Sequence, residues 1–324
     1  MNFNGKLFSL LLFALFACEK SIDIPGPLYR KQAVLTGLLQ PDSVVSVRLT
    51  YTAPINTTSE YEPITNAAVT LLDNGSPATT LVHAGGGIYK SMLKPRPGHL
   101  YQLRAEIPNY GQLAAEDVLP ISPSAQLNID KTAKGNPNNN PDFTINWQPQ
   151  AIQYNYWLSF YVSRAEWKLP DECYVPTNPP LPASSCRPID ILRRNQNFIL
   201  TNSPYLDGFN SIYDSLTGQY IYSAFARFDP NKVLGKSVEL TFTTYNQLAD
   251  TINSDKGEVN IIDLYAVGPN YDKFLKSVIR SRMNQVTDSD DVLNNPFAEV
   301  TPIYSNVTGG LGIFGAVSTK RFTY

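Results

Sequence analysis

Histidine and cysteine are scarce in this chain, which has two histidines and three cysteines among its 324 residues. Few side chains are therefore available to hold a transition metal, because zinc sites draw mainly on these two residue types. The two histidines, His83 and His99, also lack the HxxH or HExxH spacing of a zinc enzyme. The sequence therefore predicts no metal site.

An excess of basic residues is also missing, since 26 lysines and arginines stand against 28 aspartates and glutamates. Surfaces that bind nucleic acid normally carry clustered positive charge, so the composition argues against a nucleic-acid partner. The hydrophobic fraction of 43% is nevertheless high enough to bury a core. A chain of this composition is not intrinsically disordered.

Recognisable catalytic motifs are absent as well, since the chain has no G-x-S-x-G sequence and no complete set of serine-lysine acylase motifs. One segment, Gly310-x-Gly312-x-x-Gly315, matches the glycine pattern of dinucleotide-binding folds. Too few residues follow it for the helix, second strand and acidic residue that a dinucleotide site needs. We interpret these glycines as backbone positions of the last strand, and we predict no catalytic residue and no cofactor.

The N-terminus has the pattern of an exported lipoprotein. Residues 1–17 combine Lys6 with an apolar run that is too short to span a bilayer and is typical of a signal peptide. The positions Leu15-Phe16-Ala17-Cys18 match a lipobox, so we predict that Cys18 is acylated. Residues 18–32 would then form a lipidated tether, because several acyl chains on one cysteine anchor a protein stably. The alternative is an ordinary signal peptide followed by a chance cysteine.

Residues 33–120 are predicted to form short strands around a core. In residues 43–51 and 101–107, apolar and polar side chains alternate with the period of two that is typical of strands with one buried face. Turn sequences at 73–75 and 85–87 separate neighbouring strands. About seven strands in a segment of this length indicate an immunoglobulin-like β-sandwich.

Residues 121–324 are predicted to form a larger β-sandwich-like domain, which makes the whole fold all-β. One packed helix is expected near residues 270–285, where apolar residues recur at helical spacing and form a single stripe: Tyr271, Phe274, Leu275, Val278 and Ile279. Asn270 is a suitable N-cap, and Asp272 suits the positive start of the helix. We expect the helix to lie on the second domain.

Cys173 and Cys186 are the two cysteines that remain after Cys18. They bracket a proline-rich segment and do not have the CxxC spacing of a redox or zinc motif. An even pair of cysteines in an exported protein is expected to oxidise. We therefore predict a structural disulfide between Cys173 and Cys186.

Aromatic residues suggest one binding surface. All three tryptophans lie within residues 147–167, and the predicted strand at 156–163 has one apolar and one mixed face. Trp157 and Tyr161 lie on the mixed face and are the candidate surface for stacking a sugar, a peptide or a partner protein. The alternative is that this face is buried against another sheet or domain.

The C-terminus carries the most distinctive sequence, which runs through Pro296-Phe297, Tyr304-Ser305-Asn306 and Gly309-Gly310-Leu311-Gly312-Ile313-Phe314-Gly315. This succession resembles the closing motif of the domain-of-unknown-function 4249 family (DUF4249), lipoproteins found mainly in Bacteroidota. The resemblance implies an outer-membrane lipoprotein, often encoded beside TonB-dependent receptors. It transfers no catalytic residue to this chain.

These features predict a membrane-anchored, non-catalytic lipoprotein that serves as a binding or accessory subunit of a TonB-dependent outer-membrane transporter. Its contact with the membrane would be the N-terminal lipid, on either the periplasmic or the cell-surface face. The sequence does not identify the ligand. The alternatives are an exported glycan hydrolase that uses two carboxylates, and an envelope scaffold or adhesin.

Overall fold

A computed structural model describes most of the chain, in the ranges 29–54, 61–132, 140–150, 154–168, 189–201, 203–207, 211–213, 220–222, 225–244, 258–283 and 301–324. Cys18, Cys173 and Cys186 lie outside the described residues, so the acylation and the disulfide stay predictions. Strands dominate the described part of the chain. They form a sheet of twelve strands, a second sheet of four strands and a pair.

The first region consists of seven strands that bury one face each. In β1, β6 and β7 the buried side chains recur with a period of two, as the sequence predicts. The strands are β1 (Ala33–Leu39), β2 (Ser46–Tyr51), β3 (Ala68–Asp73), β4 (Ser76–His83), β5 (Ile88–Lys90), β6 (Leu100–Ile107) and β7 (Gly111–Val118). Hydrogen bonds join them in one path, β1-β2-β5-β4-β3-β6-β7, so an immunoglobulin-like sandwich is not confirmed. Their inward side chains share one core, which includes Leu35, Leu49, Val69 and Leu103.

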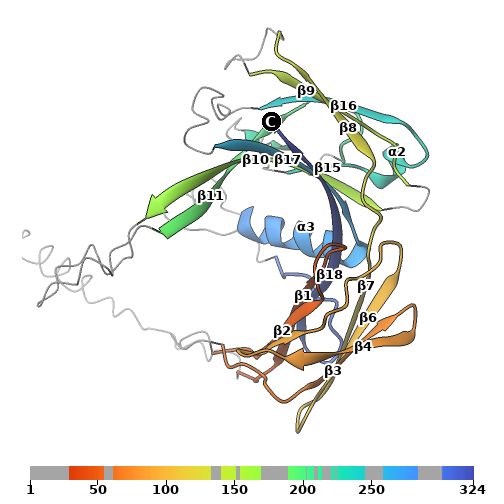
Figure 1. Cartoon of the computed structure of the whole chain (residues 1–324), viewed down its shortest axis with the longest axis vertical. Helices are drawn as coiled ribbons and strands as arrows, with labels where there is room; N and C mark the ends of the chain where they lie inside the picture. The colour runs from red at the N-terminus through yellow and green to blue at the C-terminus, as the bar shows by residue number, and fades with distance from the viewer. Residues whose placement is uncertain are drawn as a thin grey trace, which may run out of the picture.

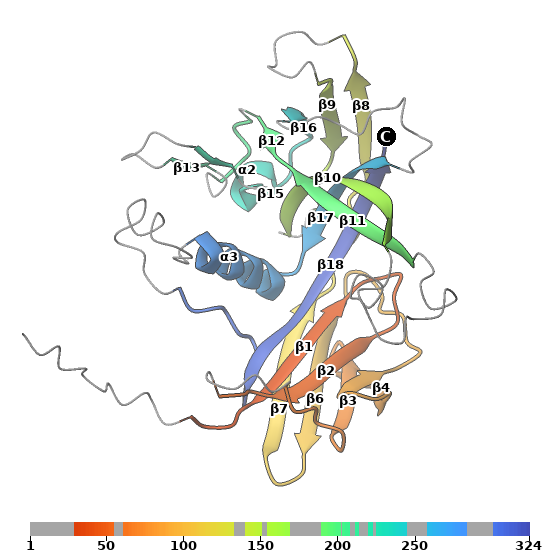
Figure 2. The same cartoon turned by 90° about the vertical axis from the view of Figure 1, so that its left-hand side faces the viewer.

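The C-terminal strand, β18 (Leu311–Thr323), belongs to both regions of the molecule. Its residues 311–316 pair in parallel with β1. Its residues 317–323 pair antiparallel with β17 (Val259–Val267), a strand of the second region. The long blue strand in Figure 2 therefore connects the two regions through continuous backbone hydrogen bonding.

Glycines allow other parts of the chain to approach β18 closely. Gly309 and Gly312 both have positive φ values, of 82° and 119°. A Cβ atom on Gly312 would lie 1.9 Å from the carbonyl oxygen of Leu35, and one on Gly315 would lie 2.5 Å from Cδ2 of Tyr271. The interpretation of this segment as a backbone feature is confirmed, because only glycine fits these positions.

In the second region a small antiparallel sheet packs on part of the large sheet (Figure 1). The small sheet has the order β12-β16-β9-β8, and β10, β11, β15 and β17 belong to the large one. Aromatic and aliphatic side chains from both sheets fill the core between them, including Phe143, Leu158, Phe242 and Leu264. The elements of this region are β8 (Ala125–Asp130), β9 (Asp142–Trp147), β10 (Asn155–Lys168), β11 (Ile189–Asn197), β12 (Ile199–Leu200), β13 (Ser211–Tyr213), β14 (Tyr220–Tyr222), β15 (Phe225–Arg227), α2 (Pro230–Val233) and β16 (Val238–Thr244).

Helix α3 (Pro269–Met283) is the predicted helix, and it lies between the two regions (Figures 1 and 2). Because it begins at Pro269, Asn270 lies in its first turn and is not the N-cap. The Asn270 amide instead donates to the carbonyl oxygen of Glu116 and accepts from the hydroxyl of Tyr304, both at 2.8 Å. The side of the helix that packs on the second region carries Leu275 and Ile279. In the described part of the chain, no helix has the length and apolar character that crossing a membrane requires.

Candidate functional site

A buried carboxylate holds the start of α3. Asp117, in β7, is 1% exposed, and one of its oxygens accepts from the backbone N–H groups of Val118 and Asn270. The other oxygen accepts from those of Tyr271 and Ala316, at 3.1 and 3.0 Å. Burial raises the pKa of Asp117 to about 6, and the four N–H donors oppose that rise. One carboxylate thus connects β7, α3 and β18, and it provides the cap that the sequence assigned to Asn270.

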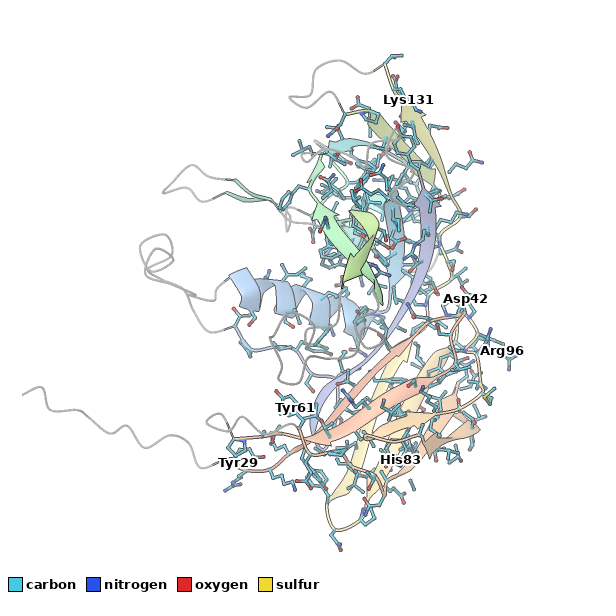
Figure 3. The ribbon with its side chains drawn as sticks, turned by 60° about the vertical axis from the view of Figure 1, so that its left-hand side comes forward. Tyr29, Asp42, Tyr61, His83, Arg96 and Lys131 are labelled. Carbon is cyan, nitrogen blue, oxygen red and sulfur yellow. The ribbon has the colours of Figure 1, made fainter. Side chains whose placement is uncertain are left out.

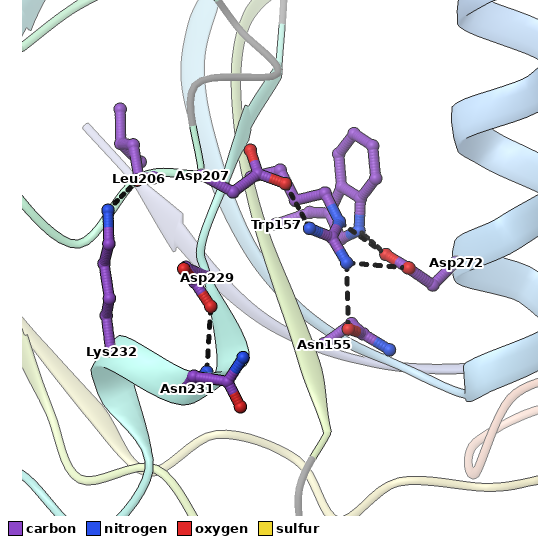
Figure 4. Close-up of polar contacts among 9 residues, drawn as sticks. Asn155, Trp157, Leu206, Asp207, Asp229, Asn231, Lys232 and Asp272 are labelled. Atoms are coloured by element: carbon purple, nitrogen blue, oxygen red, sulfur yellow. Dashed lines mark hydrogen bonds and ion pairs between the residues drawn. The ribbon is translucent and has the colours of Figure 1, made fainter.

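A second buried carboxylate, Asp272 in α3, binds a cation (Figure 4). Its oxygens accept from Nε and Nη2 of Arg227 and from Nε1 of Trp157, each at 2.8 Å. Arg227 also donates to Asp207, and to Oδ1 of Asn155 at 3.0 Å. Burial alone would lower the pKa of Arg227, but the hydrogen bonds and charges of Asp272 and Asp207 raise it above its ordinary value. This network fastens α3 to β10 and β15.

A third buried carboxylate, Asp263 in β17, binds Arg321 in β18. Nε and Nη2 of Arg321 each donate to it at 2.8 Å, and the hydroxyls of Tyr161 and Tyr265 donate at 3.1 Å. Burial raises the pKa of Tyr265, and the adjacent charge of Asp263 raises it further. Protein donors therefore surround this carboxylate, which links the strands of the second region.

The structure places both residues of the candidate aromatic surface in the interior. Trp157 is 1% exposed and Tyr161 is 5% exposed. The indole of Trp157 donates to Asp272, and the hydroxyl of Tyr161 donates to Asp263. The exposed surface predicted for these two residues is therefore not present, and the alternative of burial is observed. The face of β10 looks mixed in sequence because its polar atoms bind neighbouring elements instead of solvent.

The two histidines stabilise local structure in the first region. Nδ1 of His99 lies 2.6 Å from Oδ1 of Asp73 and 3.1 Å from Nδ2 of Asn74. Nε2 of His83 accepts from the backbone of Gly87 at 3.3 Å, and Figure 3 shows His83 far from α3. Among the described residues, no group of three or more histidine, cysteine, aspartate or glutamate side chains has the arrangement of a metal site.

An open groove lies beside α3, on the outer face of the first region. It has a volume of about 630 Å³ and is lined by Thr36, Gly37, Leu38, Ser46, Val47, Arg48, Ile88, Tyr271, Phe274 and Ile313. Strands β1, β2, β5 and β18 therefore form its floor, and the first two turns of α3 form a wall. On that wall the rings of Tyr271 and Phe274 are stacked, with centroids 6.0 Å apart.

Among the described residues that line the groove, Arg48 is the one with a charged side chain. It is exposed, and within the described ranges it forms no ion pair. Leu38, on the adjacent strand, is 36% exposed although it is a large apolar residue. Burial raises the pKa of Tyr271, so its hydroxyl stays neutral. The groove thus combines apolar walls with a single cation.

This groove is not evident from the sequence, because its residues come from four strands and a helix. Two signals in the sequence point toward it. Leu38 is apolar although it lies on the outward face of β1, and Phe274 lies at the edge of the apolar stripe of α3. Neither signal identifies a site alone, since single exposed apolar residues are common on protein surfaces.

Comparison with known proteins identifies a family but no activity. A family model described as Domain of unknown function (DUF4249) matches residues 19–323. No curated protein matches the chain. Among solved structures it is similar to a Corynebacterium diphtheriae protein, provisionally described as membrane anchored, at 11% identity and a TM-score of 0.20. The match covers 73% of this chain and 54% of the other, so the chain spans about half the length of that protein.

Proposed function

The chain belongs to the DUF4249 family, and we propose that it acts by binding, without catalysis, through the groove beside α3. The observation that supports this function is the lining of the groove. A volume of about 630 Å³ lies within the range of small-molecule sites, which are mostly apolar with a few placed polar groups. Arg48 is such a group, and the described part of the chain leaves it without an ionic partner.

The buried ionisable groups support binding over hydrolysis. A glycan hydrolase would need two carboxylates that face a substrate across a cleft. Asp117, Asp263 and Asp272 are each at most 5% exposed, and protein donors occupy their oxygens. These three carboxylates hold the fold together, and none of them lines the groove.

In the proposed function, a lipid on Cys18 anchors the protein to the outer membrane. The signal-peptide pattern and the lipobox at residues 15–18 support this anchor. A tether confines the protein to the membrane and raises its effective concentration near a barrel partner, so modest affinity is sufficient. The resemblance of the C-terminal motif implies a gene encoded beside a TonB-dependent receptor, and this supports the role of accessory subunit to such a transporter.

Site-specific crosslinking in intact cells tests this function. A photoreactive amino acid at Leu38, on the groove, should yield an adduct with an outer-membrane barrel. The same amino acid at Lys131, which lies at the far tip of the second region in Figure 3, should yield none. Adding Cys18→Ala should release the chain from carbonate-washed membranes and remove the adduct, because the tether no longer confines it.

Three outcomes would count against the proposal. Adducts of equal yield at Leu38 and Lys131 would show that the groove is not the contact surface. Turnover of a glycan by the purified chain would favour a hydrolase. Adducts that contain only a second copy of this chain would favour an envelope scaffold or adhesin.

A further inference from the structure

The floor of the groove presents one cation between apolar residues. Thr36 lies opposite Ile313 on one side and opposite Arg48 on the other, and Arg48 lies opposite Ile88. These four residues form a row across four strands. Neighbouring strands are roughly 4.8 Å apart, so the row spans roughly 14 Å. Apolar side chains stand at both ends of the row, and the guanidinium lies between them.

The charge of the groove favours a ligand with one negative charge. Arg48 is its single charged lining residue, and no acidic side chain is among the described residues that line it. A guanidinium binds a carboxylate through two parallel hydrogen bonds, which gives both affinity and orientation. A phosphate monoester carries nearly two charges at neutral pH and would need more cations than this groove offers. The hydroxyls of Thr36 and Ser46 also line the groove and can donate to a carboxylate.

The backbone around the groove favours a hydrocarbon over a peptide. Both β1 and β2 have a paired strand on each side, so neither offers a free edge to which a peptide strand could add. A peptide laid across Leu38, Ile88 and Phe274 would bring its own N–H and C=O groups against apolar side chains, where they would have no partners. A hydrocarbon chain has no such groups, and its burial against these side chains is favourable.

We infer that the groove binds a long-chain monocarboxylate of the fatty-acid class. The carboxylate is held by Arg48, and the hydrocarbon chain lies over Leu38, Ile88 and Phe274. The inference rests on the proposed binding function and names its ligand. It also agrees with the proposed anchor, because a lipid tether keeps the groove close to a membrane.

Photoaffinity labelling of the full chain in isolated membranes tests this ligand class. The probe is dodecanoate with a diazirine near its methyl end and an alkyne tag, and mass spectrometry locates the adduct. The adduct should map to peptides from β1, β2, β5 or the start of α3. Unlabelled dodecanoate should compete with the probe, whereas dodecanol, which has the same chain and no charge, should compete at least about tenfold less well, since hydrogen bonds to charged groups are the stronger ones.

Two groove variants and one control separate recognition from folding. Arg48→Gln should lower labelling at least about tenfold, because it removes the charge and leaves a shorter polar side chain. Leu38→Gln should lower labelling less, because it removes one apolar side chain from the floor. Both residues are exposed, so thermal melting should show that each variant folds as the parent does. Lys131→Gln removes a distant cation and should leave labelling unchanged.

The results distinguish this inference from the proposed function. If no adduct forms in the groove, or if dodecanol competes as well as dodecanoate, the ligand class is wrong. The same holds if Arg48→Gln labels as strongly as the parent. A barrel adduct at Leu38 without fatty-acid labelling would overturn this inference and leave the proposed function standing. Fatty-acid labelling without a barrel adduct would support the ligand class and overturn the proposed role as a transporter subunit.

Discussion

Helix α3 makes different contacts on its two sides. Toward the second region, Asp272 binds Arg227 and Trp157 in a network whose members are buried. Toward the first region, Tyr271 and Phe274 form one wall of a groove of about 630 Å³. The first side is filled by the protein itself, and the second side leaves room for another molecule.

The difference shows how charge separates structural sites from binding sites in this fold. A buried carboxylate must be fully bonded, since an unpaired charge in the interior is costly. Asp117, Asp263 and Asp272 meet this requirement through protein donors. Arg48 is exposed, so water solvates its charge and the absence of an ionic partner costs little stability. The buried carboxylates of this protein therefore connect its elements, and an exposed arginine marks the proposed site.

The largest effect is expected on the packed side of α3. Arg227→Met leaves the buried Asp272 and the partly buried Asp207 without their cation, which should lower the free energy of unfolding by about 3–5 kcal/mol. Urea unfolding followed by tryptophan fluorescence measures this change. Lys31→Ala, which removes an exposed ion pair with Glu62, is the matched control and should have little effect. Similar losses in the two variants would contradict the difference between buried and surface pairs.

The contribution of Asp117 to the free energy of unfolding should depend on pH. Its pKa rises from an ordinary value of 3.8 to about 6 in the folded chain, so the folded state holds this proton more tightly than the unfolded state. The free energy of unfolding should therefore fall as the pH rises from about 4 to about 6, by up to about 3 kcal/mol from this group. Urea unfolding at several pH values measures this fall in the free energy of unfolding.

Asp117→Asn is the control for this pH dependence, because an amide does not titrate in this range. The free energy of unfolding of the parent, minus that of the variant, should decrease between pH 4 and pH 6. A constant difference would show that another group is responsible. The variant should also be less stable than the parent at pH 4, because the hydroxyl oxygen of the protonated carboxyl group can still accept from the backbone donors and the NH₂ group of asparagine cannot.

A smaller effect is expected where α3 touches β18. A Cβ atom on Gly315 would lie 2.5–2.8 Å from atoms of Tyr271, so Gly315→Ala should push the first turn of α3 away from the strand. Overpacking of this kind costs about 1–3 kcal/mol. The same substitution should cost less in a Tyr271→Ala background, because the clash disappears. Equal costs in both backgrounds would show that Tyr271 does not limit the approach of the helix.

Local patterns in the sequence account for much of the fold. The alternation in residues 101–107 predicts β6, and helical spacing predicts α3 to within a few residues of Pro269–Met283. Both patterns depend on residues a few positions apart, so they are readable without tertiary contacts. The mixed face of β10 shows where this reasoning stops. Trp157 and Tyr161 read as a surface because the partners of their polar atoms, Asp272 and Asp263, are remote in sequence.

The sequence by itself determined the strand-rich character of this protein, the position of its helix and the glycines of its last strand. Each of these follows from side-chain periodicity or from the backbone freedom of a single residue. Tertiary structure decided that β18 pairs with both regions, that Asp117 caps α3, and that Leu38 and Phe274 line one groove. The carboxylate of Asp117 and the N–H of Ala316, for example, are 199 positions apart. Contacts at such separations depend on how whole elements pack, which no local pattern encodes.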